Sequence, residues 1–193
     1  SPFRMRVIFL DIDGVLEARS RRNFLDEAKL ARFVSLVTRT ESRVVISSHW
    51  RLVGPLHSHL CAVLRYLGVE VIGETPVRPP STVQRPMEII DWLSAYNTNA
   101  ALLNRPHATH FVAIDDRDLL SERGGAQLAG RFVKTTPALG LTDDLVDRVV
   151  HLLSHDDGAE PVPGLPELSS QHGPAVAAGA FGRVLLEVDG SST

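Results

Sequence analysis

One short stretch near the start of the chain limits its fold more than any other. The apolar residues 7–10 end abruptly in Asp11, and Asp13 and Gly14 follow within three positions. An apolar run of this length predicts a buried strand, with Asp11 at its carboxyl end, the edge where ligands bind in open α/β sheets. Two carboxylates there are costly unless a cation or a proton compensates them. The stretch therefore predicts a metal site.

Short apolar runs and helical patterns alternate along the rest of the chain. Further strands are predicted at residues 43–46, 69–73, 110–114 and 131–134. Helices are predicted from Asp26, over 55–67, from Arg85 and over 140–153, and the polar residues 97–109 are expected to be a loop with a short helical piece. The alternation predicts right-handed βαβ crossovers. We therefore expect an α/β fold, a Rossmann-like three-layer sandwich with a mostly parallel five-stranded sheet.

The composition suits one globular domain and argues against several classes of protein. The 193 residues are enough for a substantial core. No run approaches the roughly 18 apolar residues of a membrane span, so no membrane partner is expected. The single cysteine, Cys61, excludes an internal disulfide, and with it a cytoplasmic location is expected. The net charge of -3 gives no overall sign of nucleic-acid binding, although a local basic groove is compatible with it.

The composition changes near residue 155. Residues 1–155 hold the predicted sheet and its helices and form the expected catalytic domain. From residue 156 onward Gly, Pro, Ala and Ser dominate, and such a segment is poorly able to bury a core. Residues 156–193 are therefore expected to be a tail, in which residues 183–188 could form a short docking strand.

Polar residues follow other predicted strands where those strands end. Ser47 follows the second strand, and Asp115 and Asp116 follow the fourth. Arg85 opens the helix before the fourth strand. Because the carboxyl ends of parallel strands share one edge, these side chains should meet the two aspartates of the first strand in one crevice. Carboxylates suit Mg²⁺, and a hydroxyl and a guanidinium suit phosphoryl oxygens.

This ordered set resembles the four motifs of the haloacid dehalogenase (HAD) superfamily of aspartate-based phosphatases. A strand followed by Asp-x-Asp-Gly-Val-Leu at residues 11–16 is similar to the first motif, and Ser47 to the second. Arg85 stands at the third, where Lys is commoner, and Asp115 and Asp116 resemble the double-aspartate form of the fourth. The resemblance spans roughly residues 6 to 155 and implies a HAD-like fold.

The resemblance implies a catalytic role for four matched residues. Asp11 would be the nucleophile that forms an aspartyl-phosphate. Asp13 would be the general acid for the leaving oxygen and then the base for the attacking water. Ser47 would bond a phosphoryl oxygen, and Arg85 would neutralise charge on the phosphorylated state.

The resemblance also implies Mg²⁺ as the cofactor. Its ligands would be the carboxylates of Asp11 and Asp116 and the backbone carbonyl of Asp13, with Asp115 as a more distant or water-mediated ligand. The short fourth motif leaves open which of Asp115, Asp116 and Asp118 binds the metal directly.

Three further residues are candidates for substrate binding. Gly14 fits a sharp turn directly after the catalytic strand. Ser47 could simply cap the next helix, in which case Ser48 could supply the functional hydroxyl. Arg51 lies near the site in sequence and could contact the substrate or lie in a solvated loop.

The spacing between the motifs leaves no room for a large cap domain. Residues 14–47 accommodate a loop and one helix, and residues 72–85 only a Pro-rich loop. An open crevice suits a bulky or macromolecular substrate. Residues 47–51, 85–93 and 140–142 are also similar to a small HAD group associated with RNA-repair proteins. That similarity makes a nucleic-acid 3′- or 5′-phosphate one expected substrate, beside small phosphorylated molecules.

We therefore expect a Mg²⁺-dependent phosphohydrolase, a phosphomonoesterase acting through an aspartyl-phosphate intermediate. The alternative is a catalytically idle HAD-like domain that serves as a protein-interaction module, with the tail as a partner contact. The intact acids argue against the alternative, because an idle site would have lost some of them.

Overall fold

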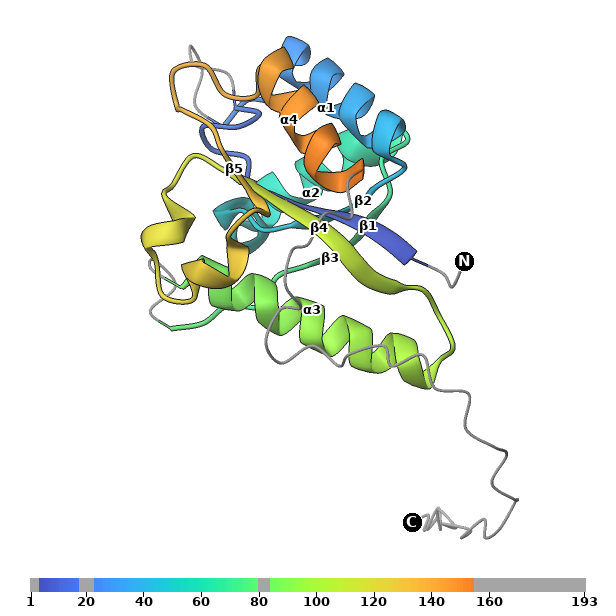
Figure 1. The fold of residues 1–193 in the computed structure, drawn as a ribbon. Coiled ribbons are helices and arrows are strands. Elements are labelled where there is room, and N and C mark those ends of the chain that lie inside the picture. Colours follow the sequence, from blue (N-terminus) through green and yellow to red (C-terminus); the bar gives the residue numbers. More distant parts are fainter. Residues whose placement is uncertain (1–3, 18–22, 80–83, 155–193) are drawn as a thin grey trace, which may run out of the picture.

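The computed structural model describes residues 4–17, 23–79 and 84–154, so the tail and its expected strand at 183–188 lie outside the described residues (Figure 1). One parallel sheet with the strand order β3-β2-β1-β4-β5 forms the centre of the fold. Its strands are β1 (Arg4–Leu10), β2 (Arg43–Ile46), β3 (Val71–Glu74), β4 (His107–Asp115) and β5 (Phe132–Lys134). The predicted α/β class with a five-stranded parallel sheet is confirmed.

Helices cover both faces of this sheet and complete the three layers (Figure 1). The described helices are α1 (Glu27–Thr40), α2 (Gly54–Tyr66), α3 (Arg85–Leu102) and α4 (Asp143–Ser154). Because successive residues of a strand point to opposite faces, Ile8 and Leu10 pack with α1, α2 and α4. Val7 and Phe9 pack with α3 on the other face. The central strand is thus buried on both sides, which explains its unbroken apolar run.

The helix starts predicted from the sequence have clear local causes. Asp26 caps α1 by accepting a hydrogen bond from the Lys29 backbone N–H at 3.0 Å. Pro86 lies in the first turn of α3, where its missing N–H costs nothing. Gly68 follows α2 with a φ of 75°, the left-handed conformation typical of helix ends.

The loop predicted at residues 97–109 is wrong for much of its length. Helix α3 continues to Leu102, and β4 already begins at His107. Asn97, which indicated a loop, is buried on the inner face of α3. Its side-chain amide donates to the Ala108 carbonyl at 3.2 Å and accepts from the Ala108 N–H at 2.8 Å. A polar residue on a buried face is thus satisfied by the strand beneath it.

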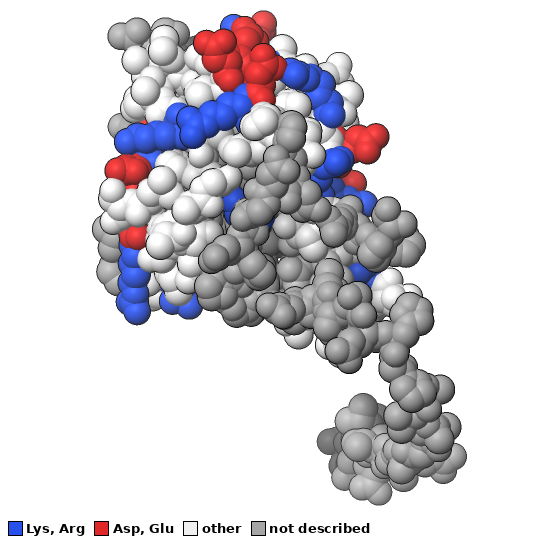
Figure 2. Space-filling view, viewed as in Figure 1, with Lys and Arg blue, Asp and Glu red and all other residues white. Residues whose placement is uncertain are grey.

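Charged side chains gather where α1 and α4 lie side by side, and Figure 2 shows the acidic ones clustered at this end. Arg32 pairs with Asp143 at 3.1 Å, and Arg39 with Asp147 at 2.8 Å. Pairs this exposed add little stability. Within the described residues, no helix has the length and apolar character needed to cross a membrane.

Candidate active site

The backbone register brings three sequence-predicted residues to one edge of the sheet. The Asp11 N–H donates to the Ile114 carbonyl at 3.0 Å, which places Asp11 between the ends of β1 and β4. The Ser47 N–H donates to the Leu10 carbonyl at 2.8 Å, so Ser47 stands beside Asp11 on the β2 side. Asp115 is the last residue of β4. Adjacent parallel strands that end in polar residues therefore create the crevice expected from the sequence.

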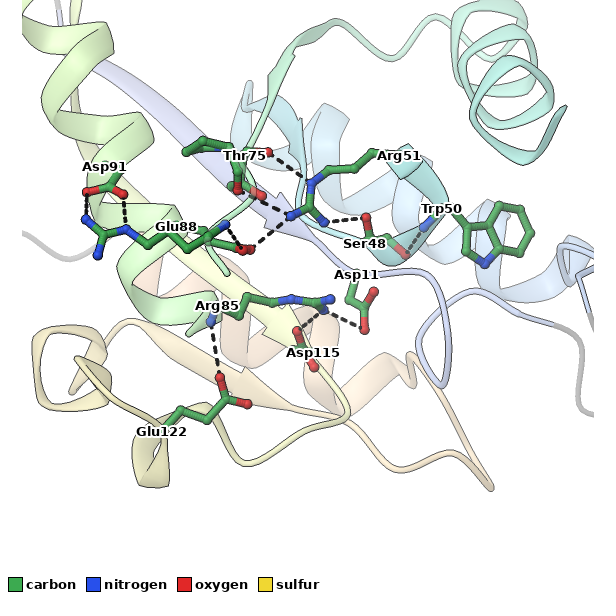
Figure 3. Close-up of polar contacts among 12 residues, drawn as sticks. Asp11, Ser48, Trp50, Arg51, Thr75, Arg85, Glu88, Asp91, Asp115 and Glu122 are labelled. Atoms are coloured by element: carbon green, nitrogen blue, oxygen red, sulfur yellow. Dashed lines mark hydrogen bonds and ion pairs between the residues drawn. The ribbon is translucent and has the colours of Figure 1, made fainter. Parts of the chain in front are cut away.

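One guanidinium joins two of the carboxylates (Figure 3). Arg85 Nη1 lies 3.0 Å from Asp11 Oδ2 and 2.6 Å from Asp115 Oδ2. The Arg85 backbone N–H donates to Glu122 Oε2 at 3.2 Å, which fixes the start of α3. Asp11 is only 3% exposed, and its Oδ1 is buried without a hydrogen-bond partner. The Arg85 guanidinium therefore pairs with both Asp11 and Asp115, and Asp11 Oδ1 is left without a hydrogen bond.

Burial raises the pKa of Asp11 to about 7, because the carboxylate loses its hydration. Arg85 opposes this rise and Asp115 adds to it, while hydrogen bonds from the Ile12 backbone and the Ser48 side chain lower the pKa. Burial alone would lower the pKa of Arg85, but its two carboxylate neighbours outweigh burial and raise that pKa, so Arg85 stays charged. The acids of the site thus exceed the positive charge available to them.

The carboxylates of Asp11, Asp115 and Asp116 can offer oxygens that lie within 4.8 Å of one another. Burial and the Asp115 charge raise the pKa of Asp116, as expected for acids that lack a full counter-charge. Hard oxygen donors are the ligands that Mg²⁺ prefers. The unsatisfied Asp11 Oδ1 adds a buried acceptor that a cation would satisfy. The donor set therefore fits a divalent cation.

The structure narrows the choice among the three acids of the fourth motif. Asp115 Oδ1 accepts from the Arg117 N–H at 2.9 Å, and its Oδ2 accepts from Arg85. Both Asp115 oxygens thus already accept protein hydrogen bonds. Asp118 is exposed and accepts from the Ser121 hydroxyl at 2.7 Å. Asp116 is therefore the acid of this motif that is best placed to bind a metal directly.

Gly14 allows the loop after β1 to approach Asp116. Its φ is 66°, and a Cβ added there would overlap the Asp116 carboxylate and lie 2.7 Å from the Asp116 Cβ. The Gly14 carbonyl accepts from the Thr135 hydroxyl at 2.8 Å, which ties this loop to the end of β5. The glycine is thus required by backbone conformation and by space. The contact supports a structural role beside the expected substrate role.

Asp13 lies in the turn after β1, partly exposed. Its Oδ1 accepts a hydrogen bond from the Trp50 indole N–H at 2.8 Å. Its carboxylate is not one of the three that gather within metal-binding distance among the described residues. This position is consistent with the expected roles of Asp13, in which the carboxylate transfers protons and only the backbone carbonyl binds the metal.

The two neighbouring serines have different surroundings. Ser47 is buried, and its hydroxyl has no hydrogen-bond partner. Ser48 caps the short 3-10 helix η1 (His49–Leu52) by accepting from the Trp50 N–H at 3.3 Å. The capping role considered for Ser47 therefore belongs to Ser48. A buried, unpartnered hydroxyl at the sheet edge is suited to a phosphoryl oxygen.

Arg51 does not line the crevice as an open contact but lies in a buried network (Figure 3). It donates to the carbonyls of Thr75 at 2.9 Å and Ser48 at 2.6 Å, and to Glu88 Oε2 at 2.9 Å. Burial lowers the pKa of Arg51, while Glu88 raises it. Its donors are thus directed at the protein, which favours a role in fixing η1 over the expected contact with substrate.

Three residues of the site region were not predicted from the sequence. Glu88 is the ion-pair partner of Arg51. The one sequence feature that could have drawn attention to it is its charge, three positions after Arg85 in a mostly apolar segment. Trp50 is buried in the core and also donates to Asp13, a contact that the sequence pattern does not indicate. Thr75 follows β3 as Ser47 follows β2, and its buried hydroxyl also lacks a partner. Only Thr75 could have been found by the rule that polar residues end parallel strands.

Comparison with known proteins finds a matching family. Residues 7–146 match the model of a family described as "HAD domain in Swiss Army Knife RNA repair proteins". The matched segment is more than half of the chain, runs from β1 into α4, and contains each of the site residues described above. No curated protein and no solved structure matches the chain.

Proposed function

The chain belongs to the family of HAD domains found in Swiss Army Knife RNA repair proteins, and on that basis we propose that it is a Mg²⁺-dependent phosphomonoesterase acting through an aspartyl-phosphate. The observation that carries the proposal is the gathering of the Asp11, Asp115 and Asp116 carboxylates at the carboxyl edge of the sheet. A phosphatase of this type needs a buried nucleophilic carboxylate beside oxygen ligands for a metal.

The reaction has two displacements. In the first, an Asp11 carboxylate oxygen forms a bond to phosphorus while the bond from phosphorus to the leaving oxygen breaks and Asp13 donates a proton to that oxygen. In the second, Asp13 takes a proton from water, the water oxygen bonds to phosphorus, and the Asp11–phosphorus bond breaks. Inorganic phosphate is released, and both carboxyl groups return to their starting states.

Two buried donors without partners support phosphoryl binding. The Ser47 hydroxyl and Arg85 Nε are both buried and form no hydrogen bond. Each can donate to a phosphoryl oxygen, which would satisfy groups that are otherwise costly to bury. Mg²⁺, held by the carboxylates of Asp11 and Asp116 and the Asp13 backbone carbonyl, would supply the charge that lets an anionic phosphate approach Asp11.

We propose the phosphorylated end of a nucleic acid as the substrate. The family description refers to RNA repair, which is said of the proteins that carry this domain. Between β1 and β2 the described residues hold a turn and α1, with no inserted cap. A crevice without a cap of its own can admit the end of a large molecule.

The test is phosphate release with and without Mg²⁺ from p-nitrophenyl phosphate and from RNA oligonucleotides with a 3′- or a 5′-phosphate. Hydrolysis that requires Mg²⁺ and disappears in Asp11→Asn is expected, because this substitution keeps the shape and removes the nucleophile. Activity that survives in Asp11→Asn would contradict the mechanism. Hydrolysis of small esters alone would contradict the substrate class, and no hydrolysis at all would favour an interaction module.

A further inference from the structure

The indole of Trp50 contacts the expected acid and base of the reaction. Trp50 Nε1 donates to Asp13 Oδ1 at 2.8 Å. Trp50 comes from η1, after β2, whereas Asp13 follows β1, so two segments 37 residues apart meet through this bond. Trp50 is 1% exposed and belongs to the core that faces α1, α2 and α4. A buried indole usually directs its N–H to a specific partner, and here that partner is an aspartate of the site.

The backbone of Trp50 is held by the protein around it, and its side chain is packed in the core. The Ser48 hydroxyl accepts a hydrogen bond from the Trp50 backbone N–H. The Trp50 carbonyl accepts one from the Val53 N–H at 3.1 Å. The next residue, Arg51, ties the same turn to Glu88 of α3 through a buried ion pair. A side chain fixed by packing and by its backbone can orient a more mobile partner.

We propose that Trp50 is a positioning residue that decides which oxygen of Asp13 carries the transferred proton. This inference rests on the proposed function. An indole N–H can only donate, so Asp13 Oδ1 must act as an acceptor toward it. In a protonated carboxyl the carbonyl oxygen is a better acceptor than the hydroxyl oxygen, so the bond to Oδ1 favours the proton on Oδ2. The bond also restrains the carboxyl rotation that would otherwise present either oxygen to the substrate.

The proton then has a defined route. In the first displacement the Oδ2–H bond of Asp13 breaks, and the proton passes to the leaving oxygen as that oxygen separates from phosphorus. In the second, Oδ2 accepts a proton from the attacking water. The indole proton stays on Trp50 Nε1 throughout. The contribution of Trp50 is thus orientation of the acid, which matters most when the leaving oxygen is a poor leaving group.

The kinetic test uses Trp50→Phe, which keeps an aromatic ring and removes the N–H. The paired substrates are p-nitrophenyl phosphate, whose leaving group needs little protonation, and phenyl phosphate, whose leaving group needs more. We expect kcat/KM for phenyl phosphate to fall about tenfold or more, since a positioned acid contributes about 100-fold or more, while kcat/KM for p-nitrophenyl phosphate changes by less than about threefold. This ratio reports the first displacement, so a slower second displacement, which both esters share, does not enter it. An equal loss of kcat/KM on both esters, or no loss on either, would overturn the proposal.

Trp92→Phe is the matched control. Trp92 lies on helix α3, stacked on Tyr96 with ring centroids 4.8 Å apart, and is partly buried against the other core cluster. If the loss of an indole only disturbs packing, Trp92→Phe should reduce the hydrolysis of the two esters equally. A selective loss on phenyl phosphate in Trp92→Phe would also count against the assignment to Trp50.

A second measurement does not depend on activity. The chain has two tryptophans, so nitrogen-15 NMR should give two indole N–H signals, which the Phe variants assign. In Asp13→Ala the Trp50 signal should move upfield and the Trp92 signal should stay in place. An unmoved Trp50 signal would overturn the contact. If the wild-type protein hydrolysed neither ester while the Trp50 signal still moved, the contact would stand, and the phosphatase together with the catalytic role of Trp50 would be rejected.

Discussion

Arg51 and Glu88 form an ion pair of 2.9 Å in which only 3% and 1% of the side chains are exposed. The pair joins η1, which carries Trp50, to helix α3, which carries Arg85. The second oxygen of Glu88 accepts from the Arg78 N–H at 2.9 Å, so the carboxylate is fully engaged. A buried pair adds little net stability relative to apolar residues, but it fixes geometry because neither partner can be left alone.

Glu88→Leu should therefore destabilise the protein strongly. The substitution leaves the Arg51 guanidinium buried without its counter-charge, and we expect a loss of about 3–5 kcal/mol in the free energy of unfolding in urea. The double variant Arg51→Met/Glu88→Leu should lose much less, because no unpaired charge remains. Arg39→Ala, in an exposed pair with Asp147, should cost less than about 1 kcal/mol. Equal losses in the single and double variants at 51 and 88 would contradict this view of the pair.

Ser47→Ala should lower activity without lowering stability, whereas Ser48→Ala should lower stability. The Ser47 hydroxyl has no partner in the protein, so Ser47→Ala should leave the urea midpoint nearly unchanged. It should lower kcat/KM by about 10- to 100-fold, the value of one hydrogen bond to a charged group. Ser48→Ala removes the cap of η1 and also the hydrogen bond to Asp11, and it should cost about 1 kcal/mol in stability. Reversed results would identify Ser48 as the hydroxyl that binds phosphate.

Gly14→Ala should damage the site beyond the cost of its backbone conformation. Alanine at a φ of 66° is strained by about 1–2 kcal/mol, and its Cβ would overlap Asp116. We expect weaker Mg²⁺ binding by isothermal titration calorimetry together with lower stability. Gly130→Ala is the control, because Gly130 has a φ of 71° and nothing lies within 4 Å of an added Cβ. If both variants bound Mg²⁺ alike, the contact of Gly14 with Asp116 would have no role at the metal site.

The sequence predicts the sheet and the convergence of its polar ends because both follow from local patterns. The run before Asp11 is apolar because β1 is buried on both faces, and the parallel register then sets Ser47 and Asp115 beside it. Asn97 and Arg51 could not be interpreted in this way. Each is a polar residue whose partners lie in distant segments, the Ala108 backbone for Asn97 and Glu88 for Arg51. These two residues are buried because they form hydrogen bonds with distant segments, and hydrophobic periodicity carries no information on such contacts.

Binding of Mg²⁺ should become tighter as the pH rises toward 7 and then level off. The pKa of Asp11 is raised to about 7, so below that pH the folded protein holds a proton that a metal must displace. The affinity should rise by about tenfold per pH unit on the acid side, and the raised pKa of Asp116 acts in the same direction. Titration calorimetry across this range measures the effect.

Asp11→Asn should bind Mg²⁺ more weakly and lose most of the pH dependence of binding. Asp118 is exposed and outside the cluster, so Asp118→Asn should keep both the affinity and its change with pH. A constant affinity between about pH 5 and pH 7 would show that Asp11 is already ionised there and does not compete for the proton.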